Sequence, residues 1–196
     1  MGKIAFVFAG QGAQYPGMGQ ELAQCSPAAA QVFQQLDALR PRTSQQCFSG
    51  TEAELKETRN TQPCMFAVEL AAAAALEEKG LRADLAAGFS LGEIGALTYT
   101  GAVDLETGFH LVCRRGELMQ QAAEKLTGRH DFRNFSSAKK TKSTVREIFD
   151  IDIYGDIEEM QILIHADDFL HNMARIIVGT LMDIGLGNRS VQDIDD

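Results

Sequence analysis

The 196-residue sequence lacks the patterns that mark metal centres, secretion and membrane insertion. Its four cysteines lie far apart, with no Cys-x-x-Cys pair and no histidine cluster beside them, which argues against a metal site and favours reduced thiols. The apolar run over 4–9 is too short for a signal peptide, and the longest one, over 70–76, is too short to span a membrane. We therefore expect a cytoplasmic protein with no bound metal and no membrane contact.

The sequence also lacks positive net charge. Its formal charge of −9 argues against a protein that coats nucleic acid in general, although it leaves room for a local basic patch. A hydrophobic content of 45% and a charged content of 23% are ordinary for a globular protein. The length suits one medium domain or two small ones.

The N-terminal stretch predicts a buried strand followed by a ligand-binding loop. Residues 3–9 are apolar and rich in strand-forming residues, as in the inner strands of an α/β sheet. Residues 10–14, Gly-Gln-Gly-Ala-Gln, follow at the carboxyl end of that strand, where open α/β sheets bind ligands. For the loop alone, an ordinary glycine-rich turn is the alternative. It is not a phosphate loop, because the Lys-Ser/Thr ending is missing.

Helical spacing predicts most of the remaining N-terminal elements. Predicted helices cover 18–40 (with a break at Ser26-Pro27), 62–79, 93–100 and 104 to about 125. Residues 41–61 are polar and predicted to be irregular, except for a short helix that a Thr51–Glu54 capping box would begin.

Residues 88–92 read Gly-Phe-Ser-Leu-Gly and lie where a strand predicted over 84–89 ends. A Gly-x-Ser-x-Gly between a strand and a helix is typical of a nucleophile elbow, which holds its serine, here Ser90, at the apex of a strained turn. The glycines leave room around the serine backbone, and free N–H groups at the helix start can stabilise an oxyanion. A motif this short also arises by chance, so its weight depends on its context.

Four segments supply that context: residues 5–14, 61–63, 88–93 and 114–119. In this order and spacing they resemble the malonyl-CoA:acyl-carrier-protein transacylases of fatty-acid synthesis. The resemblance implies that Ser90 takes a malonyl group from CoA and yields it to the thiol of acyl carrier protein, without a cofactor. It also implies that Gln11 and Leu91 donate backbone N–H groups to the oxyanion and that Arg115 pairs with the malonyl carboxylate.

Two departures from that family predict impaired activity. Phe89 stands where the family has a histidine beside the nucleophile. The family's catalytic histidine lies in a second half that this chain lacks, and none of the four histidines here sits in a matching motif. A serine needs a base to become nucleophilic at neutral pH.

The last third of the chain has a different character. Basic residues interleaved with phenylalanines between 129 and 146 are consistent with phosphate contact, although a solvated charged loop is the alternative. Alternating residues over 144–154 and 160–166 predict a hairpin, and apolar spacing over 170–185 predicts a helix.

Residues 128–135, 142–146 and 169–180 resemble the C-terminal part of a tRNA pseudouridine synthase. The resemblance implies that Arg175 belongs to that family's active site, where it would pair with a catalytic aspartate. That aspartate belongs to a Gly-Arg-Thr-Asp motif that is absent here. Lys139 and Arg146, in the basic segment, are the predicted tRNA contacts.

These patterns predict an α/β protein of two incomplete parts. Residues 1–126 would form part of an acyltransferase core that resembles α/β hydrolases, with a parallel sheet covered by helices on both faces. Residues 127–196 would form an α+β segment like part of a pseudouridine synthase. Residues 119–125 fit either family, which places the join there. The leading functional prediction is malonyl transfer with CoA thioester and acyl carrier protein as partners; the alternatives are tRNA modification or RNA binding, and an inactive fusion.

Overall fold

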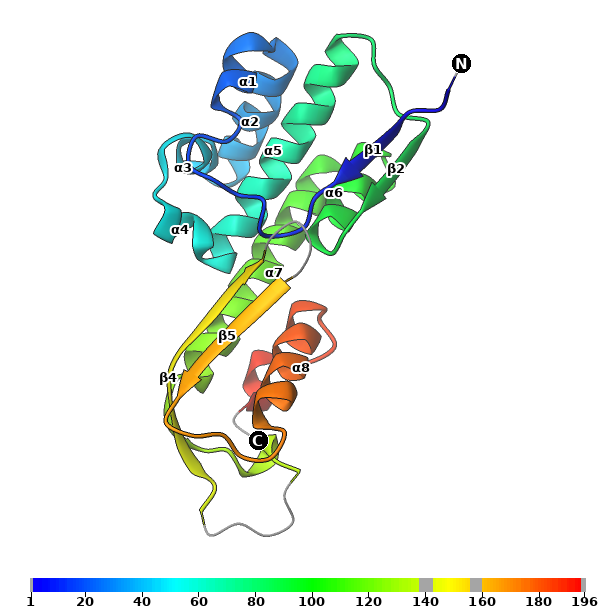
Figure 1. The fold of residues 1–196 in the computed structure, drawn as a ribbon. Helices are drawn as coiled ribbons and strands as arrows, with labels where there is room; N and C mark the ends of the chain where they lie inside the picture. The colour runs from blue at the N-terminus through cyan, green and yellow to red at the C-terminus, as the bar shows by residue number, and fades with distance from the viewer. Residues whose placement is uncertain (1, 138–142, 156–159, 195–196) are drawn as a thin grey trace.

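The computed structural model describes residues 2–137, 143–155 and 160–194. Two hydrophobic cores lie one above the other, and one long helix, α7 (Leu105–Leu126), runs through both (Figure 1). The upper core is built from the N-terminal elements and the lower one from the C-terminal elements. The predicted α/β class is confirmed.

The upper part combines two parallel strands with a group of helices. Strand β1 (Ala5–Phe8) pairs in parallel with β2 (Leu85–Gly88). The helices that precede α7 are α1 (Gln20–Cys25), α2 (Pro27–Leu39), α3 (Thr43–Ser49), α4 (Glu52–Lys56), α5 (Thr58–Glu78) and α6 (Leu91–Tyr99). Helix α5 contributes twelve buried residues and lies at the centre of the upper core, which confirms the burial that its composition predicts.

Side-chain caps determine where three of these helices begin. The Ser26 hydroxyl accepts a hydrogen bond from the backbone N–H of Ala29 at the start of α2. Thr51 and Glu54 form the predicted capping box of α4. The Asp104 carboxylate accepts from the Thr107 N–H at 2.8 Å at the start of α7. Each cap satisfies N–H groups that the first helical turn leaves without a partner.

The stretch predicted to be irregular contains a helix. Helix α3 begins after Arg42, whose φ of 71° lies in the left-handed region, and buries Thr43 and Cys47. Its polar sequence gives no helical pattern, so its packing against α5 decides its conformation. Helix α5 also starts at Thr58 rather than at 62 and contains Pro63 in its second turn.

The prediction of helices on both faces of the parallel sheet is wrong. Helix α6 packs against the face that carries Phe6 and Phe8, whose rings lie 5.3 and 5.7 Å from the ring of Tyr99. The other face, which carries Ala5 and Val7, is exposed along both strands. The helical layer that would cover it is absent from the described part of the chain.

The lower part is a three-stranded antiparallel sheet with a helix packed on it. Strand β4 (Val145–Gly155) pairs with β3 (Gly128–Asp131) and with β5 (Met160–Ala166). The helical elements are η1 (Arg133–Phe135), α8 (Met173–Gly185) and η2 (Val191–Ile194). The hairpin is confirmed, β3 was not predicted, and α8 begins three residues later than expected.

One apolar stripe on α7 joins the two cores. Its buried residues recur at alternating steps of three and four, which keeps them on one face of a helix. The row is formed by Phe109, Val112, Gly116, Met119, Ala123 and Leu126, and the two other buried residues of the helix, Gly108 and Ala122, lie directly beside it. The first two residues of the row belong to the upper core and its last three to the lower core. The helix therefore keeps its phase across the stretch where the two resemblances meet.

Candidate active site

Ser90 lies at the apex of a strand-to-helix elbow, as the motif predicts. Its φ of 54° and ψ of −103° lie outside the regions that non-glycine residues ordinarily occupy. A Cβ on Gly88 would lie 2.1 Å from the carbonyl oxygen of Gly92, and one on Gly92 would lie 2.2 Å from that of Phe8. Only glycine fits at both positions, so the two glycines of the motif make this close turn sterically accessible.

The loop after β1 is anchored by the side chain of Gln11, which is buried. Its amide Nε2 donates to the carbonyl oxygen of Ile153 at 3.0 Å, and its Oε1 accepts from the Thr58 hydroxyl at 3.0 Å. The backbone N–H groups of Gln11 and Leu91 have no hydrogen-bond partner within the described part of the chain. Both remain available to an incoming acceptor.

Arg115 points into the elbow, whereas Arg114 points away from it. Arg115 Nη2 donates to Ser90 Oγ at 3.0 Å, and its Nε is buried without a partner. Burial lowers the pKa of the Arg115 guanidinium, an effect that nearby Glu93 opposes. No carboxylate within the described ranges forms an ion pair with it, whereas the exposed Arg114 pairs with Glu117 at 3.7 Å. Arg115 is therefore a half-buried cation beside the serine, with guanidinium N–H groups that remain unpaired.

Gln62 extends the buried polar group around Gln11. Its Nε2 donates to Thr58 Oγ1 at 3.1 Å and lies 3.8 Å from the sulfur of Met119, while its Oε1 has no partner. Because Thr58 also donates to Gln11, its hydroxyl links the two glutamines. Thr58 was not singled out in the sequence, where it reads as one of many polar residues before a helix.

Glu69 is a second buried polar group that the sequence did not reveal. Both of its carboxyl oxygens are buried without a hydrogen-bond partner among the described residues. Burial raises the pKa of Glu69 to about 8; the nearby backbone N–H of Ala9 lowers it by less, and its geometry falls short of a hydrogen bond. The carboxyl group packs against α6, where a Cβ on Gly95 would meet its Oε2 at 2.9 Å. A glutamate inside an alanine-rich helix offers no pattern that would predict this burial.

No histidine takes the position of a base for Ser90. His110 pairs with Glu106, and His165 with Asp150. His130 contacts the carbonyl oxygen of Thr127, and His171 the hydroxyl of Ser137. All four lie on α7 or on the C-terminal segment, and none hydrogen-bonds to Ser90.

Two of the three residues predicted for an RNA or pseudouridine-synthase site, Arg175 and Arg146, lie in the described part of the chain. Arg175 is exposed on α8 and pairs with no carboxylate in the described ranges. Arg146 pairs with Asp168 at 3.1 Å. Lys139 lies outside the described residues, so the structure neither supports nor opposes its role.

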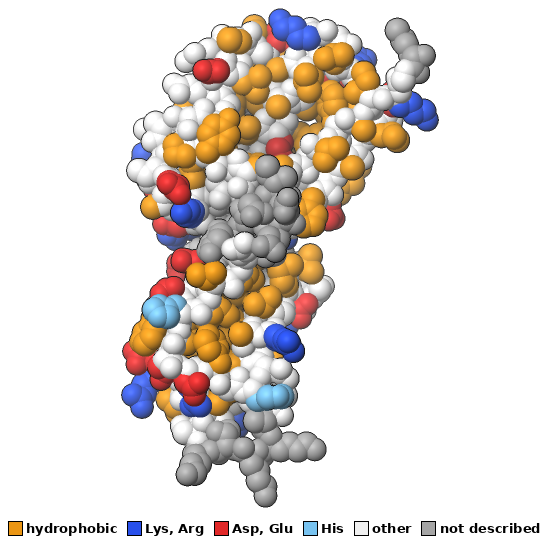
Figure 2. Space-filling model, in the orientation of Figure 1, with side chains coloured by type: hydrophobic (Ala, Val, Ile, Leu, Met, Phe, Trp, Pro, Cys, Tyr) orange, Lys and Arg blue, Asp and Glu red, His pale blue; other side chains and the backbone are white. Residues whose placement is uncertain are grey.

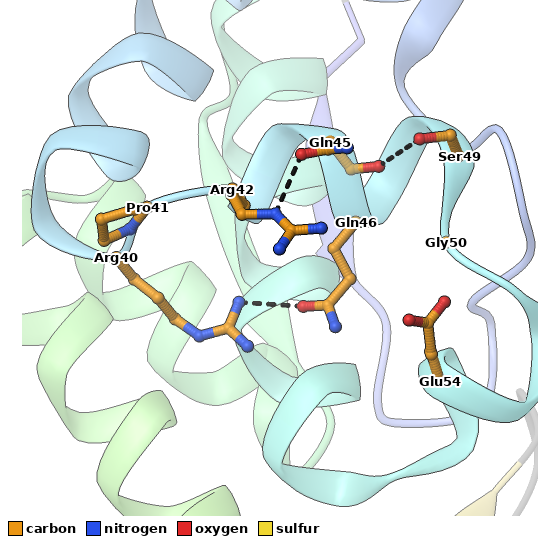
Figure 3. Close-up of a pocket in the computed structure, with 8 residues that line it drawn as sticks. All are labelled: Arg40, Pro41, Arg42, Gln45, Gln46, Ser49, Gly50 and Glu54. Carbon is orange, nitrogen blue, oxygen red and sulfur yellow. Dashed lines mark hydrogen bonds between the residues drawn. The ribbon is translucent and has the colours of Figure 1, made fainter.

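A pocket of about 330 Å³ lies between α3 and α4, away from the elbow (Figure 3). Its lining is polar and includes Arg40, whose guanidinium donates to Gln46 Oε1 at 3.0 Å and to Asn60 Oδ1 at 2.9 Å. Glu54, whose carboxylate completes the capping box of α4, lies across the pocket. The pocket contains none of the residues predicted for catalysis.

A serine at a strand-to-helix elbow, free N–H groups beside it and an inward arginine are features of an acyltransferase fold. The chain belongs to the acyl transferase domain family, whose sequence profile, described as "Acyl transferase domain", matches residues 5–157. A profile described as "tRNA pseudouridine synthase" matches residues 122–196. Both resemblances found in the sequence are thereby confirmed, and the two matches overlap over residues 122–157.

Two of the curated relatives each match one part of the chain. The chain is 41% identical over 123 residues to the malonyl CoA-acyl carrier protein transacylase of Bacillus subtilis, an alignment that covers 62% of this chain and 39% of the relative. It is 44% identical over 79 residues to tRNA pseudouridine synthase A of Halalkalibacterium halodurans, covering 40% of this chain and 30% of the relative.

The solved structures support the fold of the N-terminal part. The malonyl CoA-acyl carrier protein transacylase of Clostridium perfringens superposes with a TM-score of 0.59 at 38% identity, covering 62% of this chain and 39% of that one. The chain therefore spans about two fifths of the length of the transacylases it matches. Among the described helices, none is long and apolar enough to cross a membrane.

Proposed function

We propose that the chain is an acyltransferase that moves a malonyl group from CoA to acyl carrier protein through an ester on Ser90. The observation that carries the proposal is the 3.0 Å hydrogen bond between Arg115 Nη2 and Ser90 Oγ. It places a guanidinium with unused donors at the attacking oxygen. A guanidinium binds a carboxylate through two parallel hydrogen bonds, so a substrate with a free carboxylate fits this position.

The proposed reaction has two matching halves. Ser90 Oγ attacks the thioester carbon, the new C–O bond forms, the C–S bond breaks, and CoA leaves as a thiolate that takes up the serine proton. The thiol of acyl carrier protein then attacks the ester, its proton returns to Ser90, and the malonyl group leaves on the carrier. In both halves the N–H groups of Gln11 and Leu91 would stabilise the oxyanion, while Arg115 holds the carboxylate.

The proposed activity is slow in the chain alone. The four histidines are held elsewhere, so no imidazole removes the proton from Ser90. General-base assistance contributes roughly 10²–10⁴-fold to such a step. We also propose that the protein acts in the cytoplasm, with which its four free cysteines agree.

Transfer of radiolabelled malonyl groups to acyl carrier protein tests this proposal. We expect slow, time-dependent label on the carrier with wild-type protein and none with Ser90→Ala. Acetyl-CoA, which has no free carboxylate, should be a poorer donor. Equal transfer by wild type and Ser90→Ala would refute the proposal.

A second candidate function is RNA binding by the C-terminal segment, which we place at residues 127–196 after the join. It is supported by the exposed, unpaired position of Arg175 in a segment similar to a tRNA pseudouridine synthase. Binding to unmodified tRNA should weaken steeply with salt and should weaken further in Arg175→Ala. The control is Arg59→Ala, which removes an arginine of the N-terminal part that is already paired with Glu57. Undetectable or salt-independent binding would exclude this candidate.

A further inference from the structure

The pocket between α3 and α4 is lined by two arginines that pair with no carboxylate in the described part of the chain. These are Arg40 and Arg42. The whole chain has 18 Lys and Arg side chains against 27 Asp and Glu, and on the face seen in Figure 2 the basic ones are scattered among the acidic ones. Two unpaired arginines beside one cavity therefore make a locally positive site in an acidic protein.

The guanidinium of Arg40 is held in place by uncharged acceptors. Its Nη1 donates to Gln46 Oε1 at 3.0 Å and its Nη2 to Asn60 Oδ1 at 2.9 Å. Nη1 also donates to the Thr43 hydroxyl at 3.4 Å. Because these partners lie on α3 and α5, they fix the position of the guanidinium. Because they carry no charge, they leave its positive charge uncompensated.

Arg42 reaches the pocket from a left-handed backbone. Its φ of 71° is a conformation that residues other than glycine rarely adopt. Its Nε donates to Gln45 Oε1 at 3.0 Å, whereas neither Nη has a partner among the described residues. Figure 3 shows the side chains of Arg40 and Arg42 both directed toward the centre of the pocket.

The two glutamines that line the pocket add further donors. An arginine can only donate, so each glutamine turns its amide oxygen to its arginine partner. Gln45 does so toward Arg42, and Gln46 toward the other arginine. Their NH₂ groups have no partner within the described ranges and remain available. This wall of the pocket is therefore positively charged and rich in donors, which suits an anion with several oxygen acceptors.

Glu54 gives the opposite wall a different character. Its Oε2 accepts from the backbone N–H and the hydroxyl of Thr51, while its Oε1 has no partner in the described part of the chain. These hydrogen bonds lower the pKa of Glu54, and the charge of Arg42 adds to the effect, so the carboxylate is ionised at neutral pH. A ligand between the two walls can meet the arginines with an anionic group and Glu54 with a hydroxyl group.

We propose that this pocket binds a small organic phosphate monoester that also carries hydroxyl groups. The phosphate oxygens accept from Arg40, Arg42 and the glutamine amides, and a hydroxyl donates to Glu54. A single guanidinium saturates a carboxylate through two parallel hydrogen bonds, whereas a phosphate has oxygens for both arginines. The volume of about 330 Å³ is at the lower end for ligand sites, which favours a phosphorylated sugar over a dinucleotide.

The pocket shares no residue with the elbow around Ser90. The inference therefore goes beyond the proposed acyl transfer and does not depend on it.

Isothermal titration calorimetry of the full chain tests the ligand class. The probes are inorganic phosphate and three sugars that share one ring: glucose 6-phosphate, glucuronate and glucose. At an ionic strength of about 0.1 M, which screens attraction beyond about 10 Å, we expect glucose 6-phosphate to bind with a Kd of about 1 mM or lower. Glucuronate should bind at least about tenfold more weakly, and glucose should not bind. Absence of binding by both phosphates, or equal binding of glucose 6-phosphate and glucuronate, overturns the proposal.

Arginine variants show whether binding uses this pocket. Arg42→Gln removes an exposed guanidinium that holds no other element in place, and should weaken glucose 6-phosphate binding by about tenfold or more. Arg82→Gln is the matched control. Arg82 is also exposed and without an ion pair in the described ranges, but it lies beyond the far end of α5. Equal weakening by the two variants would mean attraction by overall charge and would overturn the site.

Glu54→Gln separates a direct role from a loss of folding. Glutamine can also complete a capping box, so α4 keeps its start. Loss of the carboxylate removes a repelling charge, and binding of inorganic phosphate should tighten by about twofold to fivefold. A folding defect cannot tighten binding. Weaker phosphate binding in Glu54→Gln would overturn the assignment of Glu54 to the opposite wall of the site.

Discussion

The side-chain amide of Gln11 donates a hydrogen bond at 3.0 Å to the backbone carbonyl oxygen of Ile153, a residue 142 positions further along the chain. The bond joins the loop beside Ser90 to the β4–β5 hairpin. Gln11 belongs to the part that resembles transacylases, and Ile153 lies in the region where the two family matches overlap. The hairpin therefore helps to hold the loop that the proposed mechanism uses.

The Thr58 hydroxyl is expected to contribute to stability through this buried polar group. Thr58→Val removes the donor to Gln11 and the acceptor for Gln62, which leaves buried polar atoms unpaired. We expect a loss of about 1–3 kcal/mol in the free energy of unfolding, measured by urea denaturation. Thr100→Val, at an exposed hydroxyl, should change it by less than about 0.5 kcal/mol. Equal effects from the two variants would contradict the assigned role.

The elbow should not tolerate a methyl group at Gly92. Its Cβ would lie 2.2 Å from the carbonyl oxygen of Phe8 and 2.5 Å from that of Ala9, so backbone would have to move. We expect Gly92→Ala to lower the free energy of unfolding by about 3 kcal/mol. Gly179→Ala is the control, since a Cβ there meets nothing within 4 Å in α8 and should stabilise by roughly 0.5–1 kcal/mol. If Gly92→Ala left the free energy of unfolding unchanged, the turn would be less tightly packed than described.

The two adjacent arginines should differ sharply in their effect on substrate selection. Arg115→Ala removes the cation at Ser90, and we expect malonyl transfer to fall by about 100-fold, corresponding to a lost charge-assisted hydrogen bond of about 3 kcal/mol. Arg114→Ala removes only an exposed ion pair and should leave the rate within about twofold. The comparison uses initial rates with malonyl-CoA and acetyl-CoA. A similar loss with both donors would argue against carboxylate recognition by Arg115.

Glu69 should make the folded protein less stable as the pH rises. Burial raises its pKa to about 8 from the ordinary value of 4.5, so the folded state holds a proton that the unfolded state releases. The contribution of the protonated Glu69 carboxyl to the free energy of unfolding is complete below pH 4.5. It is lost as the pH rises toward 8, at about 1.4 kcal/mol per pH unit. Glu69→Gln should remove this part of the slope in urea denaturation across that window. Glu21→Gln, at an exposed position, should leave the slope unchanged.

Local sequence signals predicted most of the fold. The caps at Ser26, Thr51 and Asp104 lie where their motifs place them, because a cap depends on residues only three positions apart. The parallel strands and the hairpin also follow from runs of apolar and alternating residues. Helix α3 did not follow, because tertiary burial of Thr43 and Cys47 overrides its polar sequence.

Local sequence signals likewise predicted only part of the candidate active site. The motif places Ser90 at the elbow, but two consecutive arginines give no indication of which one turns inward. The link from Gln11 to Ile153 and the burial of Glu69 depend on contacts between distant segments, which local patterns do not encode. The uncovered sheet face likewise follows from elements that are absent, so the expectation of helices on both faces failed.

A covalent malonyl group on Ser90 is the most direct evidence for the proposed acyl transfer. The full-length protein is incubated with malonyl-CoA, quenched in acid, digested and mapped by mass spectrometry. We expect a malonyl ester on the peptide that contains Ser90, absent in Ser90→Ala and strongly reduced in Arg115→Ala. An unmodified Ser90 after prolonged incubation, or an adduct that persists in Ser90→Ala, would contradict it.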